Sequence, residues 1–458
     1  MKDLALLRLA SAAFFATALL LQPRLVRAQT PDLLPSGINP GPGAYVNTIV
    51  VQRDGKVIVG GLFTLVNGTA RTNLARLNSD GSVDAGWNIG TVGPVDCLAL
   101  DGDDLYVAGE FSSIGGLARN HIAKVNTSGT GVVDTVWNPN ADGFVFAMVG
   151  DGTNLYAGGY FGFIGGQSRS RIAKLSLTGT GPADPLWNPN ANGNVLALAM
   201  GGADLYAGGY FSSIGGKSRP YLAKLSTGGT GVADPLWYHN VVNSPVAVIL
   251  PQGTNLYIGG GFTAIDSFSR HHLARLSTLG AGPVDPAWNP DANGNVLALA
   301  LSGSDLYAGG LFTTIGIQTR GYIAKVSTAD AGQVDSTWTA NANADVKALS
   351  VTGSTLYVGG KFSGIGGQSR PGLARFTSVP FAVSLAIEPG AVRSQVRILV
   401  KPIVSGYTYT MQFRYTSGDA NWDTLSSISQ IDFGDVRTVT DLNATAEGKL
   451  YRVLLTPP

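Results

Sequence analysis

One phrase recurs seven times along this chain: Leu-Tyr, a small residue, Gly-Gly, a variable residue and Phe. The first copy begins with Val57-Ile58, and the second has Ala108-Gly109 in place of Gly-Gly. The copies end, at a nearly constant interval, at Phe63, Phe111, Phe161, Phe211, Phe262, Phe312 and Phe362. Tandem units of about 40–50 residues are typical of β-propeller blades, because one unit cannot bury its apolar faces alone. The period predicts a seven-bladed β-propeller.

Each unit is predicted to form four short strands. In the fourth unit, the alternating residues 195–199 predict the first strand and residues 205–211 the second. Residues 221–225 predict the third strand, and residues 234–237 a short outer strand. Gly- and Asp-rich turns of the kind that hairpins need separate these segments. No helical periodicity follows the first 28 residues, so the predicted fold class is all-β.

The two ends of the repeat array complement each other. The outer element Asp-x-x-Trp occurs six times, and the seventh unit stops after Phe376 without it. Near the N-terminus, Asp32-Leu33-Leu34 resembles Asp184-Pro185-Leu186. We expect this N-terminal segment to supply the outer strand of the last blade, which closes the ring and removes an open sheet edge. A solenoid is the structural alternative, but it gives no reason for this split.

The repeat phrases at residues 54–63 and 356–362 look like those of bacterial delta-60-repeat β-propellers. They are similar also to the extracellular propeller of fungal cortical polarity-marker proteins. The resemblance covers about residues 30–378 and implies a secreted or cell-surface protein without an assigned catalytic activity. No functional residue can be carried over from it. The chain departs from the usual pattern at residues 87–89 and 237–240.

The first 28 residues have the features of a secretory signal peptide. Lys2 and Arg8 are basic, residues 9–21 are almost wholly apolar, and Ala28 is the kind of small residue that precedes a cleavage site. The apolar run is short for a membrane span, although an uncleaved anchor is the alternative. We expect a secreted mature chain, extracellular, at the cell surface or periplasmic, with no membrane span.

Residues 29–379 are the predicted propeller, and residues 380–458 are a different kind of sequence. The last segment lacks the repeat phrase and alternates in polarity, as in residues 396–400 and 407–413. This pattern predicts a small C-terminal β-sandwich similar to fibronectin-type modules. A sorting or anchoring role is open for this domain.

Bulk composition excludes several kinds of partner and of site. The net charge is +1 and only 13% of residues are charged, so we expect no nucleic-acid partner. Cys97, the one cysteine, permits no internal disulfide and reads as an inert core thiol. No HExxH, CxxC, Walker A or GxSxG motif occurs, and His271-His272 point to opposite faces of an extended segment. We predict no catalytic residue, metal or cofactor, and a monomer.

Charged residues that recur in every unit are interpreted as structural. We expect each aspartate to pair with a cation of its own blade and tie the outer strand to the third, because breaking a half-buried pair is costly. The aspartates are Asp32, Asp84, Asp134, Asp184, Asp234, Asp285 and Asp335. The arginines before the third strand are Arg71, Arg119, Arg169, Arg219, Arg270, Arg320 and Arg370. Lysine or arginine recurs within that strand, so Asp32 would pair with Arg370 or Arg375. A ring of binding arginines is the alternative, as carbohydrate stacking is for the six recurring tryptophans.

Function is sought where the repeats disagree. One variable column precedes the third strand, and its candidate ligand-binding residues are His121, Arg171, Tyr221, His272 and Tyr322. A second variable column follows Gly-Gly and consists of Leu62, Glu110, Tyr160, Tyr210, Gly261, Leu311 and Lys361. The alternative is that both columns are unselected surface, since surface residues vary freely.

The sequence favours a non-enzymatic module that binds a protein or a glycan through one propeller face. A structural or adhesion exoprotein without a small ligand is the alternative. A second alternative is a polysaccharide hydrolase or lyase, which requires two face carboxylates at a suitable separation. The fold alone does not decide, because propellers carry many activities.

Overall fold

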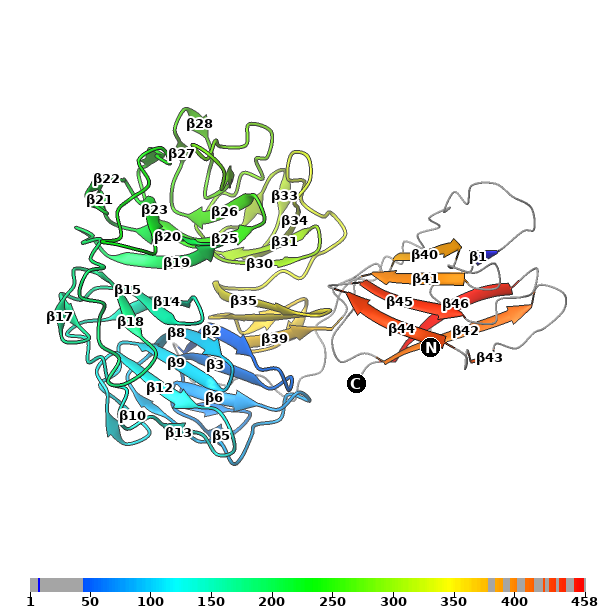
Figure 1. Ribbon diagram of the computed structural model, residues 1–458, viewed down its shortest axis with the longest axis horizontal. Coiled ribbons are helices and arrows are strands. Elements are labelled where there is room, and N and C mark those ends of the chain that lie inside the picture. Colours follow the sequence, from blue (N-terminus) through cyan, green and yellow to red (C-terminus); the bar gives the residue numbers. More distant parts are fainter. Residues whose placement is uncertain are drawn as a thin grey trace. The chain divides into compact units, whose positions relative to one another are not determined.

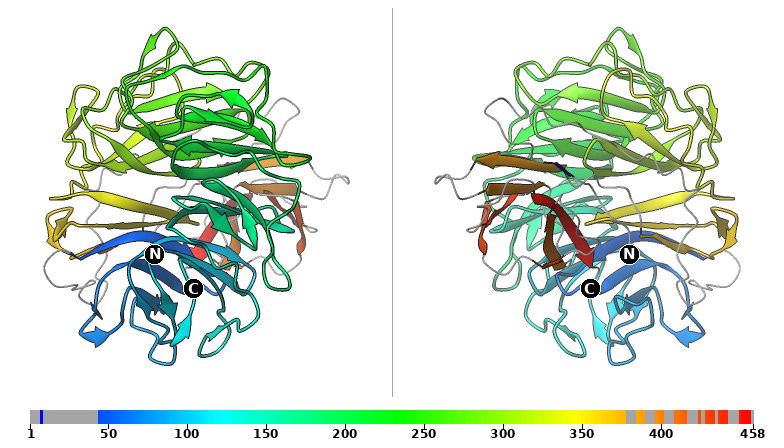
Figure 2. Two further views of the ribbon diagram at one scale, coloured as in Figure 1. Left: turned by 90° about the vertical axis from the view of Figure 1, so that its left-hand side faces the viewer. Right: turned by 90° about the vertical axis from the view of Figure 1, so that its right-hand side faces the viewer.

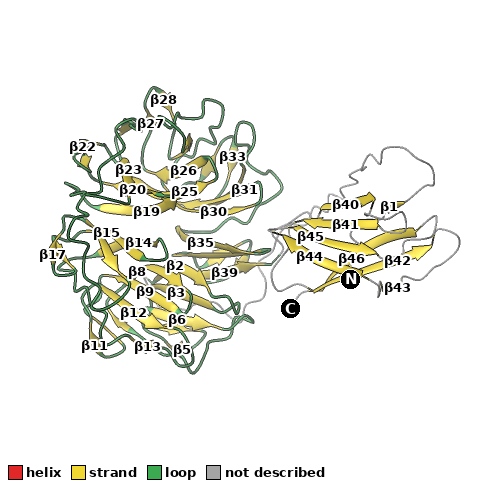
Figure 3. Cartoon of the chain, viewed as in Figure 1, coloured by secondary structure: helices red, strands yellow, loops and turns green. Residues whose placement is uncertain are grey.

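The computed structural model describes residues 44–377 and, outside that range, only the strands of a second unit. The two compact units are Ala28–Val379 and Met1–Arg27 with Pro380–Pro458. All elements of the described residues are β-strands joined by turns, without a helix (Figure 3). A helix long and apolar enough to cross a membrane is therefore also absent from this described part.

Within residues 44–377, seven antiparallel sheets share one plan of three strands (Figure 1). The first strands are β2 (Tyr45–Val51), β8 (Val95–Asp101), β14 (Val145–Gly150), β19 (Val195–Gly201), β25 (Val246–Gln252), β30 (Val296–Ser302) and β35 (Val346–Thr352). The second strands are β3 (Val57–Leu62), β9 (Asp104–Gly109), β15 (Asn154–Gly159), β20 (Asp204–Gly209), β26 (Asn255–Gly260), β31 (Asp305–Gly310) and β36 (Thr355–Gly360). The third strands are β6 (Leu74–Leu77), β12 (Ile122–Asn126), β18 (Ile172–Ser176), β23 (Leu222–Ser226), β29 (Leu273–Ser277), β34 (Ile323–Ser327) and β39 (Leu373–Phe376).

A two-strand hairpin connects the second and third strands of each sheet. The hairpins are β4 (Leu65–Val66) with β5 (Thr69–Ala70), β10 (Ser113–Ile114) with β11 (Leu117–Ala118), β16 (Phe163–Ile164) with β17 (Gln167–Ser168), β21 (Ser213–Ile214) with β22 (Lys217–Ser218), β27 (Ala264–Ile265) with β28 (Phe268–Ser269), β32 (Thr314–Ile315) with β33 (Gln318–Thr319), and β37 (Gly364–Ile365) with β38 (Gln368–Ser369). Two of them gain a further strand, β7 (Thr91–Val92) beside β10 and β24 (Val241–Val242) beside β27.

The fourth, outer strand is much shorter than the sequence predicts. It is the two-residue strand β13 (Val132–Val133) in the second sheet, and a single bridge such as Leu225–Ala233 in the fourth. The prediction of a strand at residues 234–237 is wrong. Asp234 Oδ1 accepts hydrogen bonds from the N–H groups of Leu236 and Trp237, and this aspartate-centred turn replaces strand pairing. The predicted outer strand of the last sheet, around Asp32, lies outside the described residues.

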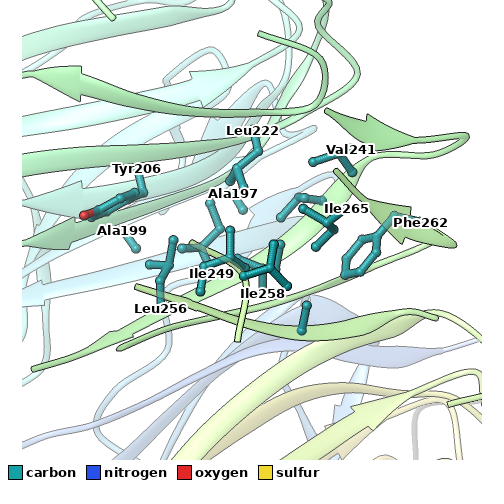
Figure 4. Packing of buried hydrophobic residues seen from close by; sticks show 14 of the residues in the cluster. Ala197, Ala199, Tyr206, Leu222, Val241, Ile249, Leu256, Ile258, Phe262 and Ile265 are labelled. Atoms are coloured by element: carbon teal, nitrogen blue, oxygen red, sulfur yellow. The ribbon is translucent and has the colours of Figure 1, made fainter. Parts of the chain in front are cut away.

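Adjacent sheets pack face to face through apolar side chains. One cluster joins Tyr206 and Leu222 of the fourth sheet to Ile249, Leu256 and Ile258 of the fifth (Figure 4). The approach is so close that a Cβ atom at Gly208 would lie 2.9 Å from Val246 Cγ1. Ala108 fits the equivalent position in the second sheet, but a Cβ atom at the next glycine, Gly209, would lie 2.1 Å from Asn194 O, so that position accepts only glycine.

The first and seventh sheets pack in the same way as consecutive sheets. A Cβ atom at Gly359 would lie 2.7 Å from Val46 Cγ1, as at Gly208. Val46 shares a buried cluster with Ala348 and Tyr357, and β2 lies beside β35 in both views (Figures 1 and 2). Arg375 Nη1 donates to Ser79 O at 2.7 Å, so a third-strand cation of the seventh sheet reaches the loop of the first.

The second unit contains two antiparallel four-stranded sheets. The first has the order β40 (Ser384–Pro389), β41 (Val396–Lys401), β45 (Val436–Asp441) and β44 (Ile428–Phe433). The second has the order β1 (Leu7–Arg8), β46 (Lys449–Thr456), β42 (Thr408–Tyr415) and β43 (Asp423–Thr424). Apart from β1, the predicted signal peptide lies outside the described residues.

Candidate binding site on the start face

Six of the recurring arginines donate hydrogen bonds to backbone carbonyls of their own sheet. Arg219 is buried, and its Nη2 donates to Asp234 O at 2.6 Å while Nη1 donates to Ser218 O at 2.8 Å. The same bond to the carbonyl of the recurring aspartate is made by Arg71, Arg119, Arg169, Arg270 and Arg320. Arg370 is also buried, but its predicted partner Asp32 lies outside the described residues. These guanidinium groups fasten the outer turn and do not form a binding ring.

The aspartate side chains face the third-strand cations. Within 4.0 Å, the pairs are Asp84 with Arg76, Asp184 with Lys174, Asp234 with Lys224, Asp285 with Arg275, and Asp335 with Lys325. The second sheet differs, since Lys124 reaches Asp104 at 2.7 Å rather than Asp134. Burial would raise the pKa of Asp335, but hydrogen bonds from Thr337 and Lys325 hold that pKa at about 2. The recurring charges are therefore engaged in stabilising each sheet.

The recurring tryptophans are buried between sheets. Trp187 Nε1 donates to Ser226 O of the next sheet at 2.9 Å, and the bonds from Trp137 to Ser176 and from Trp288 to Ser327 are equivalent. Five of the six rings also meet a second-strand tyrosine edge to face, as Trp187 meets Tyr156 with ring centroids 5.2 Å apart. With Trp187 fully buried, no ring face is open for a sugar.

The five predicted ligand residues occupy one equivalent position in five sheets. Each has a left-handed backbone with φ between 63° and 66°, at His121, Arg171, Tyr221, His272 and Tyr322. Such a conformation is uncommon for residues other than glycine, and Gly372 takes it in the seventh sheet. The position turns the chain into the third strand, where the N–H of Tyr221 donates to Phe211 O.

Three of these half-buried side chains bond the backbone of their own sheets. His121 Nδ1 lies 3.2 Å from Gly109 O, and His272 Nδ1 lies 3.1 Å from Gly260 O. Arg171 Nη1 donates to Phe161 O at 3.2 Å. Burial lowers the pKa of both histidines, which favours their neutral form. The structure thus spreads the five residues over five sheets instead of gathering them in one pocket.

A set of equivalent residues in the first strands, which the sequence analysis did not single out, brings side chains of adjacent sheets together. Each first strand carries a β-bulge at the residue after its buried valine, the bulge position, occupied by Asn47, Asp96, Phe146, Leu196, Ala247, Leu297 and Lys347. A bulge re-aims its side chain out of the regular sheet. Asn47 Nδ2 donates to Asp96 Oδ1 at 2.8 Å, so bulge residues of neighbouring sheets meet.

The bulge position is polar in three consecutive sheets around the first-to-seventh contact. These polar residues lie at the edge where first strands begin and second strands end, which we call the start face. Together with the residues around them they form the polar cluster, which consists of Tyr45, Asn47, Asp96, Glu110, Asp345, Lys347 and Lys361. The remaining four sheets place Phe, Leu or Ala at the bulge position.

The charges of the polar cluster are only partly compensated. Burial and the Glu110 carboxylate raise the pKa of Asp96 to about 7, although the hydrogen bond from Asn47 and the Lys347 charge act in the opposite direction. Asp96 Oδ2 is buried and accepts no hydrogen bond within the described residues. Burial and the neighbouring ammonium of Lys361 lower the pKa of Lys347.

Two ammonium groups lie over one tyrosine ring in this cluster. Lys347 Nζ is 4.9 Å from the Tyr45 ring centroid, and Lys361 Nζ is 5.7 Å from it. Lys361 has a carboxylate partner, Asp345 Oδ2 at 3.7 Å. No carboxylate of the described residues lies within 4.0 Å of Lys347. A half-buried ammonium that lies over a ring face, with no carboxylate within 4.0 Å, remains able to donate to another molecule.

Exposed aromatic rings lie on the same face next to the polar cluster. Tyr160 and Tyr210 follow the second strands of the third and fourth sheets and are 52% and 59% exposed. The Arg171 guanidinium lies 4.7 Å from the Tyr160 ring centroid and supports it. Phe144 precedes β14, and its ring meets His121 at 5.2 Å and Phe146 at 6.3 Å. We call Phe144, Phe146, Tyr160 and Tyr210 the aromatic row.

The second variable column therefore contained a usable signal. Glu110, Tyr160, Tyr210 and Lys361 belong to it, and the structure places all four on the start face. The bulge position could have been noticed as well, because Asp96 and Lys347 are charges within otherwise apolar strands.

Comparison with known proteins agrees with this architecture. The model of the DUF5122 β-propeller, a domain of unknown function, matches residues 52–86, 104–131, 154–181, 205–231 and 355–379. No protein with a curated description matches the sequence. The extracellular domain of a hybrid two-component system from B. thetaiotaomicron is similar in structure, with a TM-score of 0.50, 13% identity, and coverage of 81% of this chain and 46% of that one.

Two further solved structures show weaker similarity. YCF48 bound to D1 peptide has a TM-score of 0.47 at 11% identity, with 78% of this chain and 97% of that chain covered. The computationally designed Ika8 protein has a TM-score of 0.46 at 12% identity, with 74% and 98% covered. The family-model match and the structural similarity support an all-β fold of repeated propeller units.

Proposed function

We propose that the chain is an exported, non-enzymatic binding module that takes up a protein or glycan ligand on the start face. The observation that carries this proposal is the polar cluster beside the exposed aromatic row. Both occur where the repeats differ, whereas the polar residues that the repeats share are engaged in holding the sheets together. Exposed tyrosines and partly buried charges in one place are typical of a recognition surface.

The proposed scaffold is a closed ring of seven blades. The packing of Val46 on Gly359 and the bond from Arg375 to Ser79 O support closure between the first and last sheets. The segment around Asp32 would complete the seventh blade and leave no open edge. The ring holds the start-face residues of three blades in fixed positions, as preorganised binding requires.

The proposal that the chain is exported rests on the signal-peptide features of residues 1–28. The similar fold of the extracellular domain from B. thetaiotaomicron is consistent with export. The C-terminal unit would be a fibronectin-like sandwich that presents the propeller. The delta-60 resemblance suits a secreted monomer of this kind.

A hydrolase is the second candidate, because Asp96 and Glu110 interact in one cluster and Asp96 has a raised pKa. Paired carboxylates with separated pKa values are the usual machinery of glycoside hydrolysis. A hydrolase would release reducing sugar from a bound polysaccharide, and D96N or E110Q would abolish that release. A binding module leaves the polysaccharide intact.

The test is a binding screen with the purified full chain against a glycan array and against immobilised cell-surface proteins. The start-face variant Y160E/Y210E is compared with Y238E, because Tyr238 is also exposed but follows the buried Trp237 of the outer turn. Binding in either screen that Y160E/Y210E loses and Y238E keeps supports the proposal. Absence of binding, or binding that both variants keep, refutes a start-face site and favours a structural exoprotein.

A further inference from the structure

The two exposed tyrosines offer ring faces on adjacent sheets. Tyr160 and Tyr210 occupy equivalent positions, and each N–H bonds the carbonyl before a first strand, to Phe144 O and Asn194 O at 2.7 Å. Their backbones are thus fixed while more than half of each side chain faces solvent. An aromatic ring combines a broad apolar face with a polar hydroxyl edge, and an apolar ring face suits the C–H face of a sugar.

The polar cluster combines acceptors and donors at nearly equal charge. The Glu110 carboxylate is exposed and is an acceptor, and the half-buried Lys347 ammonium is a donor with no carboxylate within 4.0 Å in residues 44–377. Hydroxyl groups both donate and accept, so the hydroxyls of one ligand can bond both groups. A half-buried ammonium without a hydrogen-bond partner is costly, which makes such a bond favourable.

The charges of the cluster disfavour a charged ligand. A cationic group near Asp96 and Glu110 would also meet the ammonium groups of Lys347 and Lys361, which lie across the Tyr45 ring. An anionic group near the lysines would meet the two carboxylates. Because repulsion over a few ångströms offsets each attraction, the cluster selects for a neutral group.

These observations favour a glycan over a protein. Charged residues are depleted at the centre of protein–protein interfaces, whereas the bulge positions of the polar cluster carry half-buried charges. The tyrosines of the aromatic row belong to the third and fourth sheets, and the polar cluster to the seventh, first and second. A ligand that reaches both must be extended along the start face.

We propose that the start face binds a neutral polysaccharide, whose sugar rings stack on Tyr160 and Tyr210 while its hydroxyl groups bond Glu110 and Lys347. This inference rests on the proposed function of the same face and specifies its ligand class. It predicts that an oligosaccharide of several units is needed, because a single sugar cannot contact both parts of the site.

The experiment is affinity electrophoresis and calorimetry of the full chain with neutral glucan, mannan, xylan and galactan, and with alginate and chitosan as charged counterparts. We expect saturable binding to at least one neutral polysaccharide, inhibited by its oligosaccharides but not by its monosaccharide. Y160A and Y210A should each weaken binding about fivefold to tenfold, the usual worth of one aromatic contact. E110A should weaken it by about tenfold, since a charged acceptor is lost. The control Y238A should bind as the wild type does.

The outcomes separate this inference from the proposed function. Thermal melting checks that all variants are folded, and the exposed Tyr160 and Tyr210 keep the test valid if E110A is not folded. Binding confined to alginate or chitosan contradicts the neutral class. Capture of a surface protein that needs Tyr160 and Tyr210, without polysaccharide binding, overturns the glycan inference but leaves a start-face binding module. Binding of any probe that ignores both tyrosines overturns both.

Discussion

The outer turns and the start face differ in how far their polar groups are hydrogen-bonded or paired with opposite charges. In the outer turn of the fourth sheet, Arg219 bonds the carbonyl of Asp234, and the Asp234 carboxylate bonds two N–H groups and lies 3.4 Å from Lys224. On the start face, Asp96 leaves one buried oxygen without a hydrogen bond and Lys347 has no carboxylate within 4.0 Å among the described residues. The outer turn therefore stabilises the fold, whereas the start face keeps bonding capacity for another molecule.

The largest effect should come from the buried tryptophans of the outer turns. Trp187→Ala removes a fully buried ring together with its bond to Ser226 O in the next sheet. We expect a loss of about 3–5 kcal/mol in the free energy of unfolding, measured by urea denaturation. Ligand binding by the remaining folded protein should be unchanged. A loss below about 1 kcal/mol would contradict an inter-sheet role for the ring.

A smaller loss is expected at the buried arginines. Arg219→Leu keeps apolar volume but leaves the carbonyls of Ser218 and Asp234 without their donor. The free energy of unfolding should fall by about 1–3 kcal/mol, because buried acceptors lose their hydrogen bonds. The control Lys217→Met changes an exposed cation of β22 and should have little effect. If R219L lost ligand binding without losing stability, the arginines would be a binding ring after all.

Acid should weaken the outer turns specifically. The folded-state pKa of Asp335, about 2, lies below its ordinary value of 3.8, so its contribution to stability is present above pH 4. That contribution is lost as the pH falls from about 4 to 2, because the unfolded chain then binds the proton first. D335N should be less stable than the wild type by about 1–2 kcal/mol at pH 6 and nearly equal to it at pH 2. A constant difference over this range would show that the charge is unimportant.

The comparison also explains which parts of the molecule the sequence could predict. The three main strands follow from the repeat phrase and the alternation, as at residues 195–199. The prediction of an outer strand at residues 234–237 was wrong, because an aspartate-centred turn satisfies the N–H groups that would pair in a strand. The alternation of a sequence does not show where a hydrogen bond from a side chain to the backbone takes the place of backbone pairing between strands.

The candidate site was predicted only in part. The residue type at the position of Tyr221 and His272 varies between repeats, but the backbone there is left-handed in each repeat and determines where these side chains lie. Asp96 was not among the candidates because the sequence does not show where a β-bulge adds a residue to a strand and turns its side chain out of the regular sheet. Its contact with Asn47 joins two repeats and depends on the packing of adjacent sheets.

The most direct test of the contrast between the two regions is the stability of D96N as a function of pH. The folded-state pKa of Asp96 is about 7, above its ordinary value of 3.8, so the fold favours its protonated form. The wild type therefore loses stability as the pH rises from about 4 through 7, whereas the uncharged D96N does not. The account predicts that D96N matches the wild type at pH 3 and exceeds it at pH 8 by on the order of 1 kcal/mol, since solvent at this face screens part of the shift. A D96N protein that is less stable at every pH would contradict it, because Asp96 would then hold the fold together as Asp234 does.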